Sequence, residues 1–300
     1  MSRFGLLAVV SGLIAFTSVA MAETADDSSG GSTRYGAFGL LDHRSTYGTY
    51  WFPEPLHVDE MDVDREFRVD YFHGENHRAQ SDEVRAEIEW NFDQLTIECG
   101  IPYHRDSESE FDPELGRTVR NTADGVGNIE FAARFPVFEY VDPAKRFDYT
   151  LAAGLEVAAP SGSKISKDTE IVPAIFNLIR IGEHFSIQAS AGYSILIGPD
   201  EGGTNTLETN IVLGYYIDHD QLPLPKTLSV VPIFELNNET ALSGDTSGQN
   251  ILFGTVGARL NFESIGSVQP RLGLGYVFPI DRGARDEMDW GVIVSVVFEL

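Results

Sequence analysis

Ionisable side chains recur at every second position in several segments of this 300-residue sequence. In the stretch EVRAEIE, residues 83–89, Glu83, Arg85, Glu87 and Glu89 alternate with apolar residues. Successive side chains of a β-strand point to opposite faces, so a strand here places these four groups in one row. Such a row beside water in a narrow passage selects ions by sign, and its arginines can pair with carboxylates.

The same alternation assigns charged residues in other segments to a water-facing side. We therefore predict a water-lined interior, or lumen, whose acidic excess favours cations. The alternative is that the inward charges only pair with one another and stiffen the wall, with no permeant at all. The predicted lumen-lining residues are Asp64, Glu66, Arg68, Asp70, Arg85, Glu87, Glu89, Glu98, Glu130, Arg134, Asp148, Glu156, Glu208, Glu235 and Arg271.

Two further motifs contain reactive residue types without the context that their chemistry needs. His73, Glu75 and His77 offer two imidazoles and a carboxylate, in a spacing that matches no standard metal motif. Residues 161–164 have the Ser-x-x-Lys spacing of acylating hydrolases, but Pro160 favours a turn over the helix which that chemistry requires. We assign no catalytic residue, no metal and no cofactor, and we expect a protein that is not an enzyme.

Rows of charge need β-strands to position them, and twelve segments of the sequence show strand-like alternation. Each is bounded by turn-forming residues, and none shows helical periodicity. The predicted strands are residues 62–73, 83–92, 95–103, 127–138, 147–159, 170–180, 184–197, 206–217, 227–237, 250–262, 268–278 and 289–300.

The opposite face of these segments is apolar, and the pattern continues across the predicted turn at Asp93-Gln94. In a soluble sandwich this face would pack against a second sheet. Here aromatic residues recur near strand ends, as in the aromatic girdles of membrane barrels. The candidate girdle residues are Trp90, Phe92, Tyr103, Tyr149, Tyr193, Phe278, Trp290 and Phe298.

The connections between the predicted strands alternate between short and long. Asp93-Gln94 is the shortest, and the acidic stretch His104–Val126 is the longest. Short turns on one side and long loops on the other are typical of outer-membrane barrels, whose short turns face the periplasm. The fold class predicted is all-β: a single antiparallel transmembrane β-barrel of about twelve strands, with short periplasmic turns and longer extracellular loops.

Composition excludes several other classes of protein. The sequence has 21 Lys and Arg against 46 Asp and Glu, a formal net charge of −25, which argues against nucleic acid as a partner. Cys99 is the only cysteine, so no intrachain disulfide framework is possible. Beyond residue 22 no apolar run is long enough for a membrane-spanning helix, so any insertion into a bilayer must use strands.

The N-terminus predicts export. Arg3 precedes an apolar run from Phe4 to Val19 and the small-residue motif at residues 20–22, which together are typical of a cleaved signal peptide. We therefore expect a signal peptide at 1–22, an irregular periplasmic leader or plug segment at 23–60 and the barrel at 61–300. Within the leader, TYGTYWFPEP (46–55) is expected to fold into the lumen, or else to remain a disordered leader. The possible plug residues are Tyr47, Tyr50, Trp51 and Phe52.

Three stretches carry a resemblance to a known family: DGVGNIEFAARFPVF (124–138), AAGLEVAAPSG (152–162) and LGLGYVF (272–278). Over residues 124–300 the chain resembles the phenol-degradation meta-pathway (MetA-pathway) family of transporter-like outer-membrane proteins. It departs from the family pattern with Asn128 in place of Asp. It also ends in Leu300 rather than an aromatic residue, although Phe298 lies on the same face two residues earlier. The resemblance implies transport of small solutes, including hydrophobic or aromatic compounds, and supplies no catalytic residues.

These observations predict an outer-membrane channel or facilitated transporter for small solutes. The expected partners are outer-membrane lipid, the barrel assembly machinery and a small-molecule permeant. Two alternatives remain open: a structural or surface-interaction barrel without transport, and a soluble secreted all-β binding protein.

Overall fold

The structure is a computed structural model that describes residues 34–35, 40–41, 52–58, 65–92, 95–112, 117–161, 168–198, 204–244 and 246–300. All of these residues belong to one compact unit, Arg34–Leu300. The predicted signal peptide, the plug candidates Tyr47, Tyr50 and Trp51, and the lumen candidate Asp64 lie outside the described residues.

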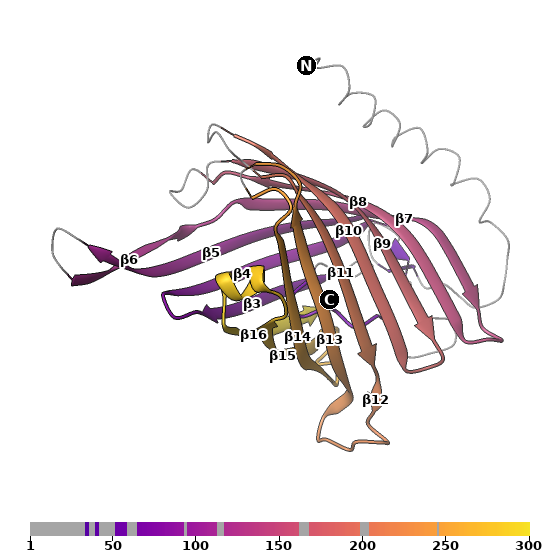
Figure 1. The fold of residues 1–300 in the computed structure, drawn as a ribbon. Coiled ribbons are helices and arrows are strands. Elements are labelled where there is room, and N and C mark those ends of the chain that lie inside the picture. Colours follow the sequence, from indigo (N-terminus) through magenta and orange to yellow (C-terminus); the bar gives the residue numbers. More distant parts are fainter. Residues whose placement is uncertain are drawn as a thin grey trace, which may run out of the picture. The chain divides into compact units, whose positions relative to one another are not determined.

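Twelve antiparallel strands close into a barrel, as the alternating segments predict (Figure 1). Each strand pairs with its neighbour along the chain, β16 pairs with β3, and β11 pairs directly with β13. The barrel strands are β3 (Glu66–Glu75), β4 (Ala79–Phe92), β5 (Leu95–Asp112), β7 (Ile129–Asp142), β8 (Phe147–Ala159), β9 (Thr169–Ile181), β10 (Phe185–Ile197), β11 (Thr206–Tyr215), β13 (Thr227–Ala241), β14 (Asn250–Phe262), β15 (Gln269–Pro279) and β16 (Trp290–Glu299).

The remaining elements are short or lie outside the barrel wall. β1 (Arg34–Tyr35) pairs with β2 (Leu40–Leu41), and β12 (Ile217–Asp218) extends the hairpin that leads into β13. No helix among the described residues has the length and apolar character needed to cross a bilayer. The helix α2 (Arg282–Glu287) is a single short helix between β15 and β16.

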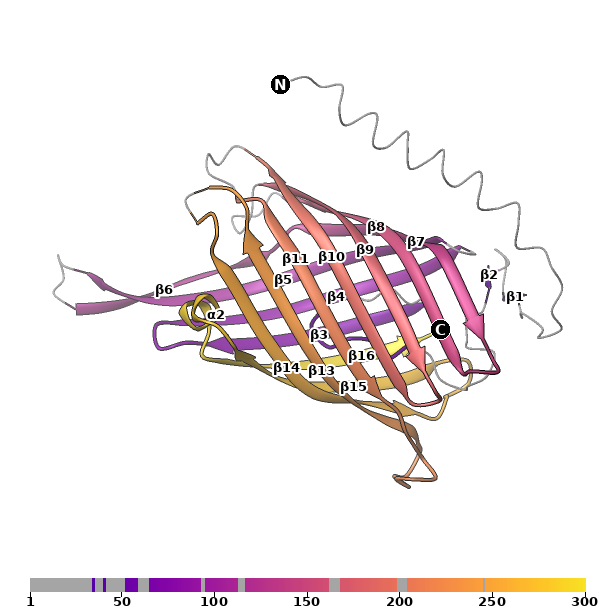
Figure 2. The same cartoon turned by 45° about the vertical axis from the view of Figure 1, so that its right-hand side comes forward.

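The sequence predicts a long loop at His104–Val126, and this prediction is wrong, because most of the stretch is β-structure. β5 continues to Asp112 and pairs with β6 (Arg117–Val126), so most of this stretch is a two-stranded ribbon that projects from the barrel (Figures 1 and 2). Beyond the apolar belt both faces of a strand meet water, so the apolar alternation that identifies a strand disappears while backbone pairing continues. The connection between β3 and β4 is likewise shorter than predicted, only residues 76–78.

Helix α2 was also absent from the sequence prediction. Asp281 caps it by accepting hydrogen bonds from Ala284 N (2.9 Å) and from Asn250 Nδ2 (2.8 Å). Burial opposes ionisation of Asp281, but these bonds and one from Leu252 N outweigh that effect and lower its pKa. A helix of six residues is too short to show a 3.6-residue period, which explains why the sequence pattern does not reveal it.

The outward face of the barrel wall is apolar. Phe131, Ile175 and Leu274 are 51, 53 and 60% exposed, and the last two lie in the middle of their strands. The predicted girdle residues also lie on this face, among them Trp90, whose ring is 4.9 Å from the guanidinium carbon of Arg65. Such a continuous apolar surface around a closed barrel is what a bilayer-facing wall requires.

A charged substitution in the middle of the outward face tests whether that face meets lipid or water. We expect Leu274→Arg to destabilise the barrel in lipid vesicles by about 2–4 kcal/mol, because Leu274 is at the middle of β15. Leu222→Arg, in the exposed hairpin after β12, is the matched control and should change stability by less than about 1 kcal/mol. Urea unfolding in vesicles measures both variants, and equal effects would contradict a lipid-facing wall.

Candidate functional site

The structure places the predicted lumen residues that it describes on the inward side of the barrel, opposite the exposed apolar residues of the same strands. They are buried or half-buried. Most of them lie on β3, β4, β5, β7 and β8, and few lie on the remaining strands. The inward-facing residues are Glu66, Arg68, Asp70, Arg85, Glu87, Glu89, Glu98, Glu130, Arg134, Asp148, Glu156, Glu208, Glu235 and Arg271.

Residues Phe52–Val58, here called the plug segment, run through the barrel interior. Glu235 on β13 accepts hydrogen bonds from the backbone N–H groups of Leu56 (2.5 Å) and His57 (3.0 Å). Gln188 on β10 donates to the carbonyl oxygen of Pro53 (2.5 Å). Strand side chains therefore satisfy the backbone of an irregular segment that has no sheet partner of its own.

A buried ion-pair network holds the plug segment to β14 and β15. Glu54 is 1% exposed and pairs with Arg259 (Nη1 to Oε2, 2.6 Å) and with Arg271. Arg271 also reaches Glu299 on the last strand, with 2.5 Å between Nη2 and Oε2. Arg68 donates to the carbonyl oxygen of Pro55 (3.2 Å). Charges this far from water persist only when paired, so Glu54 and the arginines depend on each other.

The network continues onto the plug backbone. Arg259 donates from Nε to the carbonyl oxygen of Glu54 (3.1 Å) and from Nη2 to that of Pro55 (2.7 Å). One guanidinium thereby binds both the side chain and the main chain of the segment. This use of several donors in a fixed geometry is characteristic of arginine and is not available to lysine.

Glycines in β14 and β15 make room for Leu56, which is fully buried. A Cβ atom at Gly257 would lie 2.4 Å from Leu56 Cδ1, and one at Gly273 would lie 2.6 Å from Leu56 Cδ2. Any side chain at these positions would collide with the plug segment. Leu56 and Val58 join an apolar cluster with Val212 and Ile293, which lies inside a largely polar lumen.

Aromatic contacts complete the seating of the plug segment. The ring of Phe52, the only plug candidate within the described residues, lies 5.0 Å from the guanidinium carbon of Arg180 on β9. His57 stacks on Phe72 of β3, with 5.5 Å between ring centroids. Residues 52–58 lie among inward side chains of the barrel strands, and the rest of TYGTYWFPEP is outside the described residues.

A second ion-pair network lies on the wall formed by β4, β5 and β7. Arg85 Nη2 is 3.0 Å from carboxylate oxygens of Glu98 and Glu130 and 3.1 Å from one of Glu87. Arg134 Nη2 is 2.5 Å from Glu98 Oε2. Each arginine thus bridges neighbouring strands, and acidic side chains outnumber the arginines on this wall.

The densest group of carboxylates adjoins this network. Oxygens of Glu66, Glu87 and Glu89 lie within 4.8 Å of one another, and Arg134 Nη1 is 3.9 Å from Glu89 Oε2. Carboxylates with this spacing could bind a divalent cation, but arginines already share their surroundings. We assign no metal to this group.

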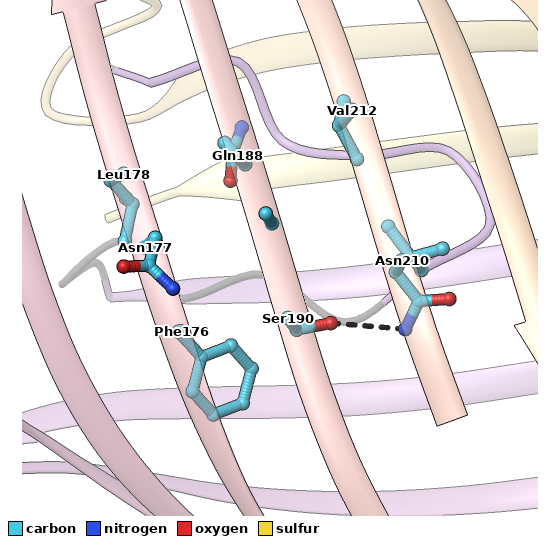
Figure 3. Close-up of a pocket in the computed structure, with 9 residues that line it drawn as sticks. Phe176, Asn177, Leu178, Gln188, Ser190, Asn210 and Val212 are labelled. Carbon is cyan, nitrogen blue, oxygen red and sulfur yellow. Dashed lines mark hydrogen bonds between the residues drawn. The ribbon is translucent and has the colours of Figure 1, made fainter. Parts of the chain in front are cut away.

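The wall formed by β9, β10, β11 and β13 also carries a chain of hydrogen-bonded neutral polar groups. Asn237 donates to Asn210 and Asn210 to Ser190, each bond being 3.0 Å long. Figure 3 shows Ser190 and Asn210 side by side on adjacent strands, with Phe176 on the next strand. The cavities along this wall are small, about 10 and 30 Å³, and Glu156 and Glu208 line the second.

A larger cavity, about 270 Å³, lies between the plug segment and the charged wall. Its lining includes apolar and aromatic groups of the plug segment and of the barrel wall, as well as ionisable side chains of β3, β4, β5 and β7. The lining residues are Leu56, His57, Val58, Arg68, Asp70, Phe72, Glu83, Arg85, Glu87, Glu98, Arg134 and Ile293.

Several interior residues are not among the lumen residues that the sequence predicts. Arg180, Arg259 and Glu299 lie on the inward side of predicted strands, and the same alternation that identified Arg271 could have identified them. Glu54 had no comparable signal, because the plug segment follows neither strand nor helix periodicity. Only its contacts with residues more than two hundred positions away reveal its role.

Comparisons with known proteins show the fold. No family model matches the sequence, and a search of curated proteins finds no match. An outer membrane channel from Pseudomonas putida F1 is similar in structure, with a TM-score of 0.58 and 15% identity over 83% of this chain and 100% of that one. The NanC porin (TM-score 0.44, 10% identity, 79% and 98% coverage) and the KdgM porin (0.41, 12%, 78% and 99%) are more distant. The chain therefore shares the barrel fold of an outer membrane channel.

Removing Glu54 should release the plug segment. Glu54→Ala leaves Arg259 and Arg271 without that carboxylate, and breaking a buried pair costs about 3–5 kcal/mol. In a Cys99→Ser, Val58→Cys background, we expect maleimide to label the buried position 58 much faster when Glu54 is removed. Glu263→Ala, an exposed acid in a turn, should leave labelling slow. Equal labelling rates would show that the ion pairs do not hold the segment.

Proposed function

We propose that this protein is an outer-membrane channel or facilitated transporter that passes small solutes through an acidic lumen narrowed by the plug segment. The observation that carries the proposal is the sorting of side chains in a closed barrel: apolar residues face outward and ionised residues face inward. A closed wall with these two faces separates hydrocarbon from water. Residues 1–22 would direct export, and the barrel assembly machinery would insert the chain.

The charge of the lumen supports cations as the favoured solutes. Arg85 and Arg134 are engaged with carboxylates, and Arg259 is engaged with the plug backbone. Further acids, including Glu156 and Glu208, line the cavity along the other wall. A narrow passage with an excess of fixed negative charge attracts cations and repels anions.

The plug segment supports a restricted passage rather than an open pore. Its polar backbone, buried ion pairs and apolar contacts attach it to several strands, so it narrows the lumen in the folded protein. The family resemblance suggests hydrophobic or aromatic compounds as permeants. Phe72 and Phe176 line interior cavities and supply apolar surface for such molecules.

A surface-interaction role is the second candidate, because the β5–β6 ribbon projects from the barrel and exposes most of its side chains. Conductance separates the two functions. A surface-interaction barrel would insert into a membrane without passing ions, and deleting the ribbon tip would abolish only its binding.

The full mature protein should conduct when reconstituted in planar bilayers. We expect small, cation-selective currents, measured as a reversal potential in a potassium chloride gradient. Heat-modifiable migration on gels confirms that the reconstituted barrel is folded. A folded, inserted barrel without current would refute the transport proposal.

Neutralising lumen acids should lower the cation preference. One unit charge at about 4 Å in water contributes about 1 kcal/mol, so we expect Glu208→Gln to reduce the cation-to-anion permeability ratio by up to about fivefold. Glu156→Gln should act in the same direction, since both residues line one cavity. Glu183→Gln, in an exposed turn, is the matched control. An unchanged ratio in both lumen variants would show that these acids do not set selectivity.

A further inference from the structure

We propose that the 270 Å³ cavity between the plug segment and the charged wall is a binding site for a small organic cation, an ammonium group attached to a compact aromatic or apolar body. This inference deepens the proposed function by naming a class of solute. It rests on the size of the cavity, on the charge of one side and on the apolar character of the other.

The cavity is large enough for an organic molecule. An apolar cavity of about 150 Å³ in another protein accommodates benzene, so 270 Å³ leaves room for a ring with a short charged substituent. A bare metal ion would leave most of this volume unfilled. The tightest carboxylate group, Glu66 with Glu87 and Glu89, contributes only Glu87 to the cavity lining.

One side of the cavity presents carboxylates in excess over the groups that neutralise them. Arg85 and Arg134, both in the lining, are bound to Glu98 and to further acids. Arg68 is 2.7 Å from Asp70 through Nε and also holds the plug backbone. An anionic ligand would have to compete with these carboxylates for each guanidinium, whereas a cation gains from the surplus negative charge.

Glu83 is the acid best placed to receive that cation. Its side chain is 32% exposed, and its ion-pair partner is His104, at 3.3 Å between Nδ1 and Oε2. Glu83 differs in this from Glu87 and Glu98, which pair with Arg85. Its position at the rim of the cavity allows an ammonium group to approach without full loss of hydration.

The other side of the cavity suits an apolar or aromatic body. Phe72 stacks on His57, and Leu56, Val58 and Ile293 complete this surface. An ammonium group near an aromatic face is stabilised by the ring quadrupole, in addition to its attraction to carboxylates. Because His57 and Val58 belong to the plug segment, a bound molecule contacts the plug and the wall together.

Isothermal titration calorimetry on the full mature barrel in detergent tests the site with benzylamine, which is protonated at neutral pH. Benzyl alcohol and benzoate are matched neutral and anionic probes, and magnesium chloride tests an inorganic cation. We expect saturable binding of one benzylamine per barrel, with weaker or no binding of the other three. Benzoate or benzyl alcohol binding as tightly as benzylamine, or binding of magnesium alone, would overturn the inference.

Two variants locate the binding. Glu83→Gln should weaken benzylamine binding by about tenfold, the effect of losing one charged contact. Phe72→Leu should weaken it by about fivefold while keeping the apolar volume. Glu263→Gln should bind like the unmodified protein, and heat-modifiable migration confirms folding of all three. Unchanged affinity in both cavity variants would place the ligand elsewhere.

Binding and conduction are measured separately, so their failures can be told apart. A barrel that conducts cations but does not bind benzylamine refutes the cavity site and leaves the channel function intact. A barrel that binds benzylamine but carries no current refutes the transport proposal, and the cavity remains a ligand site.

Discussion

The interior of this barrel depends on the pairing of charges that its strands turn inward. A strand that presents apolar side chains to one solvent must present its alternate side chains to the other, and here those alternate residues are ionised. Away from bulk water an unpaired carboxylate or guanidinium is costly, and the arginines of the two networks bridge carboxylates or bind carbonyl oxygens. Arg85 and Arg134 do so along the wall, and Arg259 and Arg271 do so across the lumen to Glu54.

This constraint explains why the plug segment and the barrel form one structure. Without Glu54, the wall formed by β14 and β15 would present two inward arginines with one fewer carboxylate. Without Gly257 and Gly273, Leu56 could not approach the same wall. The segment in turn leaves its own backbone N–H groups unpaired unless Glu235 accepts them. The ion pairs of Glu54 and the space left by the two glycines therefore favour the same position for the plug segment. The space that remains beside it forms the 270 Å³ cavity.

The comparison of prediction with structure separates two kinds of information. The twelve barrel strands were predictable because period-2 alternation is a local property, visible within ten residues of any one strand. The β5–β6 ribbon was missed because its faces both meet water, and α2 because it is too short to show a period. The inward direction of residues such as Glu98 and Arg271 follows from the same alternation. The identity of their ion-pair partners does not follow from it.

The sequence by itself determined the number of strands and the two-faced wall, because both depend on residue types at neighbouring positions. Only the tertiary structure decided which charges meet, where the plug segment lies and where a cavity remains. Glu54 and Arg271 are 217 positions apart, and no local pattern relates them. Their contact exists because closure of the barrel brings distant strands around one lumen, and a buried charge there must find its partner within reach.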